Sequence, residues 1–161
     1  MYINGEWRSG DATFPVYNPA SGELIGEVTD ASVAQVNEAI EAASTALPGW
    51  SAATAYERSA VLYRAHSLMM ERQKSLAELM TREQGKPLKA AMNEVKYAAD
   101  FLLWFAEEAK RVYGETIPSA RSDQRFLVHK QPVGVVAAVT PWNYPISMLT
   151  RKLGPALAAG C

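Results

Sequence analysis

The sequence predicts an α/β fold in which three long helices precede the first strand-helix unit of a doubly wound parallel sheet. Apolar residues recur at helical spacing in three regions, at about 30–48, 56–83 and 88–113. Val133–Val139 is instead a continuous apolar run rich in β-branched residues, as is typical of a strand buried on both faces. A loop and a further helix are expected after it, and this order is the repeating unit of a doubly wound sheet.

Short extended runs separated by turn pairs occupy residues 1 to about 28. The turn pairs are Asn4-Gly5, Ser9-Gly10, Asn18-Pro19 and Ser21-Gly22. We therefore expect small β-structures that lie on a larger body.

The boundaries of the three helices follow from capping and breaking residues. Asp30 or Ser32 can cap the first helix, and Pro48-Gly49 is expected to end it. The second helix is expected to break near Arg72-Gln73-Lys74. Gly114 is placed to stop the third helix.

The sequence changes character again after the third helix. Arg125–Lys130 has the pattern of an exposed strand, and Pro132 would interrupt a central hydrogen-bonded ladder. We therefore expect a sheet edge or a hairpin in this region.

Composition and charge narrow the class of protein. Of the 161 residues, 48% are hydrophobic and 20% are charged, which is ordinary for a globular chain. The 16 basic and 17 acidic residues are interspersed, so no basic stripe is offered to a nucleic acid. No apolar run approaches the roughly 20 residues of a membrane span, and Met1–Gly5 leads directly into strand-like sequence, so no secretory leader is expected. We expect a cytoplasmic protein that binds neither nucleic acid nor membrane.

The single cysteine, Cys161, permits no intrachain disulfide and no thiolate metal cluster, which fits a reducing compartment. His66 and His129 lack the spaced partners of a metal site, so no metal is expected. Ala156–Gly160 has the pattern of a helix end with a glycine stop, after which a strand should follow. We therefore expect the chain to be truncated.

The loop Thr140–Pro145 is the candidate site, because ligands of open α/β sheets collect at the carboxyl ends of the strands. The Asn143 amide could donate to a developing oxyanion, although an N-cap role is the commoner one at such a position. Trp142 could form a cofactor wall or belong to the core. No Gly-x-Gly-x-x-Gly or Walker lysine loop supports a nucleotide site independently.

Thr140-Pro141-Trp142-Asn143-Tyr144-Pro145, placed after an apolar strand, resembles the signature of the aldehyde dehydrogenase superfamily. The resemblance extends over the whole chain. Four further segments occur in the order found in that family: Tyr2–Trp7, Tyr17–Gly22, Glu83–Pro87 and Leu153–Cys161.

The resemblance implies roles for the loop. In this family a cysteine thiolate attacks the aldehyde, and the resulting oxyanion receives a hydrogen bond from the asparagine that matches Asn143. Thr140, Pro141, Trp142 and Asn143 would line the nicotinamide ribose of NAD or NADP. The nucleophilic cysteine and the base glutamate would lie beyond Cys161, which we expect to be a buried, inert thiol.

Arg151 suggests the substrate. It lies on the helix face opposite the apolar residues, where a solvated arginine is the default expectation. However, Ile146–Cys161 and Trp104–Pro118 are similar to the succinate-semialdehyde branch, in which a matching arginine holds the distal carboxylate. The resemblance implies oxidation of succinate semialdehyde to succinate, through a thiohemiacetal, with hydride transfer to NAD(P)+. Glutarate or 2-oxoglutarate semialdehyde are the alternatives.

The resemblance also implies an organisation. Residues 1–120 would be the β-turns and helices of the cofactor-binding domain, and residues 121–132 the first arm of an oligomerisation hairpin. Residues 133–161 would begin the Rossmann-like sheet. A homodimer or homotetramer would form in the full-length enzyme. The rival interpretation is that the chain is a non-catalytic fragment or interaction module, because nucleophile and base are missing.

Overall fold

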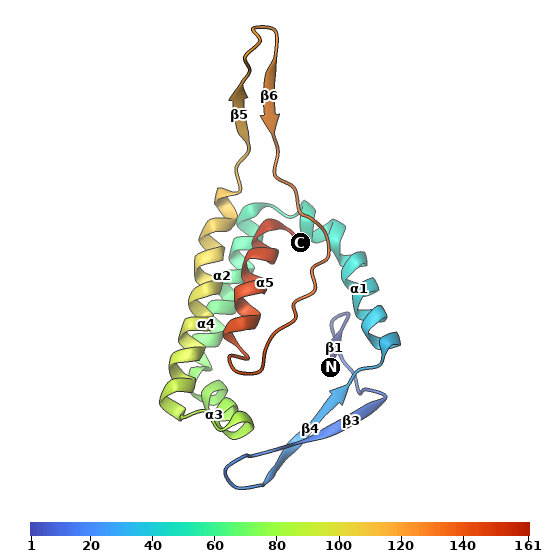
Figure 1. The fold of residues 1–161 in the computed structure, drawn as a ribbon, viewed down its shortest axis with the longest axis vertical. Helices are drawn as coiled ribbons and strands as arrows, with labels where there is room; N and C mark the ends of the chain where they lie inside the picture. The colour runs from blue at the N-terminus through green and yellow to red at the C-terminus, as the bar shows by residue number, and fades with distance from the viewer.

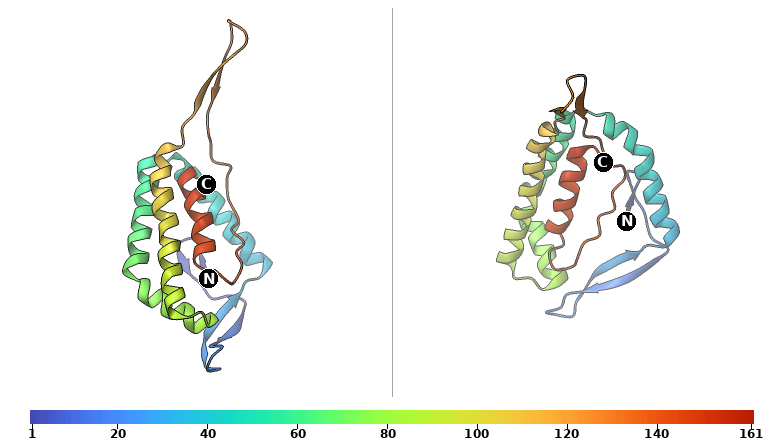
Figure 2. Two further views of the ribbon diagram at one scale, coloured as in Figure 1. Left: turned by 60° about the vertical axis from the view of Figure 1, so that its left-hand side comes forward. Right: turned by 45° about the horizontal axis from the view of Figure 1, so that its top comes forward.

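The structure is a computed structural model that describes residues 1–161. Its body is a bundle of four helices: α2 (Ala55–Glu71), α3 (Gln73–Gln84), α4 (Leu88–Glu108) and α5 (Ser147–Ala159). The helix α4 packs against α2, α3 and α5 (Figures 1 and 2). The predicted break in the second helix is confirmed, because α2 ends and α3 begins around Arg72. A single 3-10 turn, η1 (Ala109–Arg111), extends α4.

Small side chains on α4 allow this close packing. Several alanines of α4 are fully buried. One apolar cluster packs around the C-terminal half of α4 and another around its N-terminal half: Leu62, Leu102, Ala106, Ala109 and Ala158 in the first, and Ala77, Met80, Ala91 and Val95 in the second. Gly154 of α5 faces α4 at the closest approach. A Cβ atom there would lie 2.9 Å from a ring carbon of Phe105 and 3.4 Å from the carbonyl oxygen of Phe101.

The helix α1 (Val33–Ala52) lies apart from the bundle (Figures 1 and 2). Ser32 caps it in a reciprocal capping box with Gln35, as predicted in part. The predicted end at Pro48-Gly49 is wrong. A proline removes only its own amide bond, and the next turn still closes because the Ala53 N–H donates to the carbonyl of Gly49.

Two small antiparallel hairpins precede α1, which confirms the predicted β-structure. The first joins β1 (Tyr2–Ile3) to β2 (Glu6–Trp7), and the second joins β3 (Ala12–Tyr17) to β4 (Leu24–Asp30). Asn4 and Gly5 form the first turn with φ angles of 51° and 82°, in the left-handed region that such two-residue turns require.

A third hairpin projects from one end of the bundle (Figures 1 and 2). It pairs β5 (Glu115–Pro118) with β6 (Arg125–Val128). Residues 121–132, which the resemblance assigns to an arm of an oligomerisation hairpin, hold part of the turn and the strand β6. Pro118 is the last residue of β5 and lies at the end of a two-stranded ladder, where a missing N–H is tolerated.

The predicted parallel strand Val133–Val139 is not formed by these residues. The segment has no regular secondary structure, and Val133 and Val139 are 89% and 84% exposed. Two physical reasons apply. A strand exists only with a hydrogen-bonded neighbour, and no strand follows α5 within the chain. Gly134 also has a φ of 117°, which departs from strand geometry.

The three sheets of the structure are all antiparallel and two-stranded, so the predicted doubly wound sheet is not present in residues 1–161. The coarser description, an α/β chain dominated by long helices with small sheets, is confirmed. None of its helices combines the length and the apolar character needed to cross a bilayer.

Candidate functional site

The loop Thr140–Pro145 leads from the irregular segment into α5 and passes close to α4 (Figures 1 and 2). Two of the competing interpretations fail here. Trp142 is 80% exposed, so it is not a core residue of this chain. The N-cap position of α5 is Ile146 and no side chain of the loop caps the helix, so Asn143 is not an N-cap.

Glu94 of α4 caps α5 in place of the loop. Its Oε1 atom accepts hydrogen bonds from the backbone N–H groups of Ile146 at 3.1 Å and Ser147 at 3.3 Å. These are amides that a helix start leaves unpaired, and a carboxylate there also interacts favourably with the helix dipole. Glu94 is buried, so the entry of the loop into α5 is fixed by a carboxylate from another helix.

Lys86, between α3 and α4, completes this arrangement. Its ammonium group pairs with Oε2 of Glu94 and also donates to the backbone carbonyl oxygen of Asn143 at 2.8 Å. The Nζ atom lies 4.2 Å from the ring centroid of Tyr144, within the range of a cation–π interaction. Lys86 thus contacts two successive residues of the loop.

Arg151 lies one helical turn into α5, on the same side as the loop. Its Nη2 atom donates to the hydroxyl of Tyr97 at 2.8 Å, and its guanidinium carbon lies 5.0 Å from the ring centroid of Phe101. The side chain is exposed but held against the aromatic face of α4, which differs from a freely solvated arginine.

A cavity of about 230 Å³ brings the loop and the arginine together. Its lining is Tyr97, Tyr144, Ser147, Met148 and Arg151. Tyr144 comes from the candidate loop, so the predicted substrate arginine and the residue after Asn143 share one cavity. A small carboxylated molecule in this space could reach the guanidinium with one end and the loop with the other.

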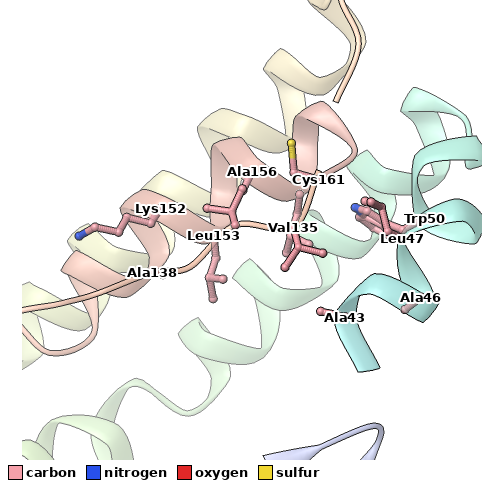
Figure 3. Close-up of a pocket in the computed structure, with 12 residues that line it drawn as sticks. Ala43, Ala46, Leu47, Trp50, Val135, Ala138, Lys152, Leu153, Ala156 and Cys161 are labelled. Atoms are coloured by element: carbon pink, nitrogen blue, oxygen red, sulfur yellow. The ribbon is translucent and has the colours of Figure 1, made fainter. Parts of the chain in front are cut away.

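A second cavity of about 230 Å³ has a different chemistry (Figure 3). It lies between α1, the segment around Val135 and α5, and Lys152 is its only non-hydrophobic lining residue. Cys161 lines it and is partly exposed, so the expected burial of this thiol is not complete. No group of three potential metal ligands converges in the chain.

Lys86, Glu94 and Tyr97 were not identified as site residues from the sequence. A signal existed for Glu94: it lies three residues after Ala91 and four before Ala98, on the apolar face of its helix. An acidic residue there is rarely buried unless it is paired. Nothing local indicates which residues it pairs with, because the amide of Ile146 is 52 residues away.

Comparison with known proteins shows which family the chain matches. The model of the aldehyde dehydrogenase family matches residues 7–161. The glutarate-semialdehyde dehydrogenase of Pseudomonas putida is 60% identical over 99% of this chain and 34% of its own length. The NADP(+) succinate-semialdehyde dehydrogenase GabD of Escherichia coli is 55% identical over 99% of this chain and 33% of its own length.

A solved structure, described as an NADP dependent enzyme of E. coli, superposes with a TM-score of 0.96 at 54% identity. The match covers 99% of this chain and 34% of that one. The chain thus spans about a third of the length of the relatives it matches. On the family match over nearly all its residues, the chain belongs to the aldehyde dehydrogenase family.

Proposed function

We propose that the protein carrying this chain oxidises a semialdehyde with a distal carboxylate, with succinate semialdehyde as the substrate and NAD or NADP as the hydride acceptor. The observation that carries the proposal is the cavity that Arg151 shares with Tyr144 of the Asn143 loop. The names of the relatives, succinate- and glutarate-semialdehyde dehydrogenase, support the same class of substrate.

Arg151 would bind the carboxylate. A guanidinium offers five N–H donors in a planar fork that matches a carboxylate bidentately. The Tyr97 hydroxyl engages Nη2, and the rings of Tyr97 and Phe101 hold the plane of the group. An arginine that is already ordered loses less conformational entropy when the substrate binds.

Asn143 would stabilise the oxyanion. When a cysteine thiolate outside residues 1–161 attacks the aldehyde carbon, the carbonyl electron pair moves to oxygen, and that oxygen needs a donor. The Asn143 side chain is exposed and is not used as a helix cap. Its amide is therefore available to donate to the oxyanion, a contact that is stronger in the transition state than in the ground state.

Thr140, Pro141, Trp142 and Asn143 would hold the nicotinamide ribose. All four are exposed, and the indole of Trp142 packs against no core of this chain. Exposed backbone groups and a flat exposed ring suit contact with a sugar and a planar heterocycle. When bound, NAD or NADP supplies the acceptor for the aldehyde hydride.

The test is an assay of the complete protein with NAD and with NADP. We expect kcat/KM for succinate semialdehyde to exceed that for butanal, which has the same chain length without the carboxylate, by about tenfold or more, because a hydrogen bond to a charged group contributes about 1.5–3 kcal/mol. Equal values for the two aldehydes would contradict the proposal.

Glutarate semialdehyde is the second candidate, and the 60% identity to a glutarate-semialdehyde dehydrogenase favours it. The two substrates differ by one methylene, which a binding site distinguishes by about 1–3 kcal/mol. Competition between the two semialdehydes in a single assay of the complete protein decides between them through the ratio of their kcat/KM values.

We also propose that the complete protein is a homodimer or homotetramer that assembles through the β5–β6 hairpin. Both strands have an unpaired edge, and Leu127 is 68% exposed at the projecting end of the molecule. Unpaired strand edges of this kind readily add strands from another chain. Light scattering on the complete protein measures the mass directly, and a monomer would refute this assembly.

A further inference from the structure

The ion pair between Lys86 and Glu94 is the most deeply buried charged pair of the chain. The side chain of Glu94 is 1% exposed and that of Lys86 is 14% exposed. We propose that Lys86 and Glu94 are positioning residues that hold the backbone of Asn143, and so set where its amide meets the reacting oxygen. This inference rests on the oxyanion role proposed for Asn143.

The contacts of the pair converge on the loop. Lys86 donates to the carbonyl oxygen of Asn143 and lies over the ring of Tyr144, while Glu94 accepts from the amides of Ile146 and Ser147. The loop is thus held at Asn143 and again three residues later. Between these two anchors few backbone arrangements remain possible.

The anchor on Asn143 is its backbone, which leaves its side chain free. Lys86 engages the carbonyl oxygen, and this oxygen is joined to the Cα atom through a single carbon. A shift of this peptide unit would therefore move the side-chain amide of Asn143 by a comparable distance. Displacements of about 1 Å in positioned groups can cost about 10²-fold in rate.

Stability alone does not account for the pair. Burying two charges carries a desolvation cost that their attraction often fails to exceed, so a well-packed apolar pair would stabilise the fold about as well. The charged pair provides hydrogen bonds with a defined direction. An ammonium and a carboxylate fix specific N–H and C=O groups, whereas apolar side chains would leave the peptide units of the loop without partners.

The experiment measures the first turnover of the complete protein, as the rapid formation of reduced cofactor on mixing with succinate semialdehyde. The test variant is Lys86→Met with Glu94→Gln. It leaves no unpaired buried charge, and the glutamine can still accept from the α5 amides. The control is Lys89→Met, which removes an exposed lysine at the start of α4, the helix that contains Glu94. Both are also made in an Asn143→Ala background.

We expect Asn143→Ala to slow the first turnover by about 10²–10³-fold, the effect of removing one oxyanion donor. The Lys86→Met, Glu94→Gln protein should be slower by about tenfold to 10²-fold, with a KM for the aldehyde within about twofold of the parent. In the Asn143→Ala background the same pair of changes should cost less than about twofold, because the group they position is gone. Lys89→Met should match its background in both cases.

The other outcomes separate the two claims. If Asn143→Ala is slow and the Lys86, Glu94 variant is as fast as the parent, the positioning role is refuted and the oxyanion role stands. An equal loss in both backgrounds would show that the pair supports the fold in general, which also refutes positioning. If Asn143→Ala is not slow, the oxyanion role fails and the inference with it. If the paired variant does not fold, Lys86→Arg is compared in the same two backgrounds, because it keeps the charge opposite Glu94 and changes only the group that meets the Asn143 carbonyl.

Discussion

Substitution of Arg151 by alanine gives a direct test of substrate binding. The guanidinium already donates one N–H to Tyr97, which leaves its remaining donors for a carboxylate. A hydrogen bond to a charged group contributes about 1.5–3 kcal/mol. Since Arg151 is exposed in this structure, we take the lower part of this range, about 2 kcal/mol, for the whole contact. That energy corresponds to about a 30-fold loss of kcat/KM.

The assay compares succinate semialdehyde with butanal on the complete protein, by absorbance of the reduced cofactor. For Arg151→Ala we expect the loss on succinate semialdehyde to lie mainly in KM, and the values for butanal to stay within about twofold. Lys96→Ala, which removes an exposed cation from the neighbouring helix, is the control and should change neither substrate. Equal losses on both aldehydes, or no loss on the semialdehyde, would refute carboxylate binding by Arg151.

Three further substitutions test the local structure. Tyr97→Phe removes the hydroxyl that accepts from the site arginine and should raise KM for the semialdehyde by about three- to tenfold, the equivalent of about 1 kcal/mol, while leaving butanal unchanged. Ser32→Ala removes the cap of α1 and should speed amide hydrogen exchange of that helix about fivefold, whereas Ser44→Ala, on its exposed side, should not. Gly154→Val should destabilise the α4–α5 packing by about 1–3 kcal/mol and lower Tm, whereas Gly49→Val, which meets open space, should lower it less.

Helical periodicity predicted most of the fold because the apolar faces of α2, α3, α4 and α5 are long enough for the pattern to be unambiguous. The break at Arg72 and the hairpin near Arg125 were also predicted. Pro48 was misjudged, because a proline near a helix end removes one bond without stopping the turns that follow.

The segment Val133–Val139 shows a different limit of sequence patterns. A β-branched apolar run indicates that a segment suits a buried strand, but a strand also needs a partner. Residues 1–161 supply none, so the same residues stay irregular and exposed. The apolar pattern of a segment indicates that it is suited to a strand. Whether the strand forms depends on a partner strand supplied by residues elsewhere in the sequence.

The two interpretations of Asn143 were inseparable in the sequence because both place an amide just before a helix. The structure shows that Asn143 is not the cap of α5. The backbone N–H groups of Ile146 and Ser147 donate instead to Glu94, which lies about 50 positions earlier, on α4. An asparagine that capped α5 would have its side-chain oxygen committed to the backbone and its orientation set by the helix. Since a distant carboxylate does the capping, the Asn143 side chain is not committed to the helix, and the first amides of α5 are still satisfied. The cost is a buried acid, and Lys86 offsets that cost while it holds the Asn143 carbonyl.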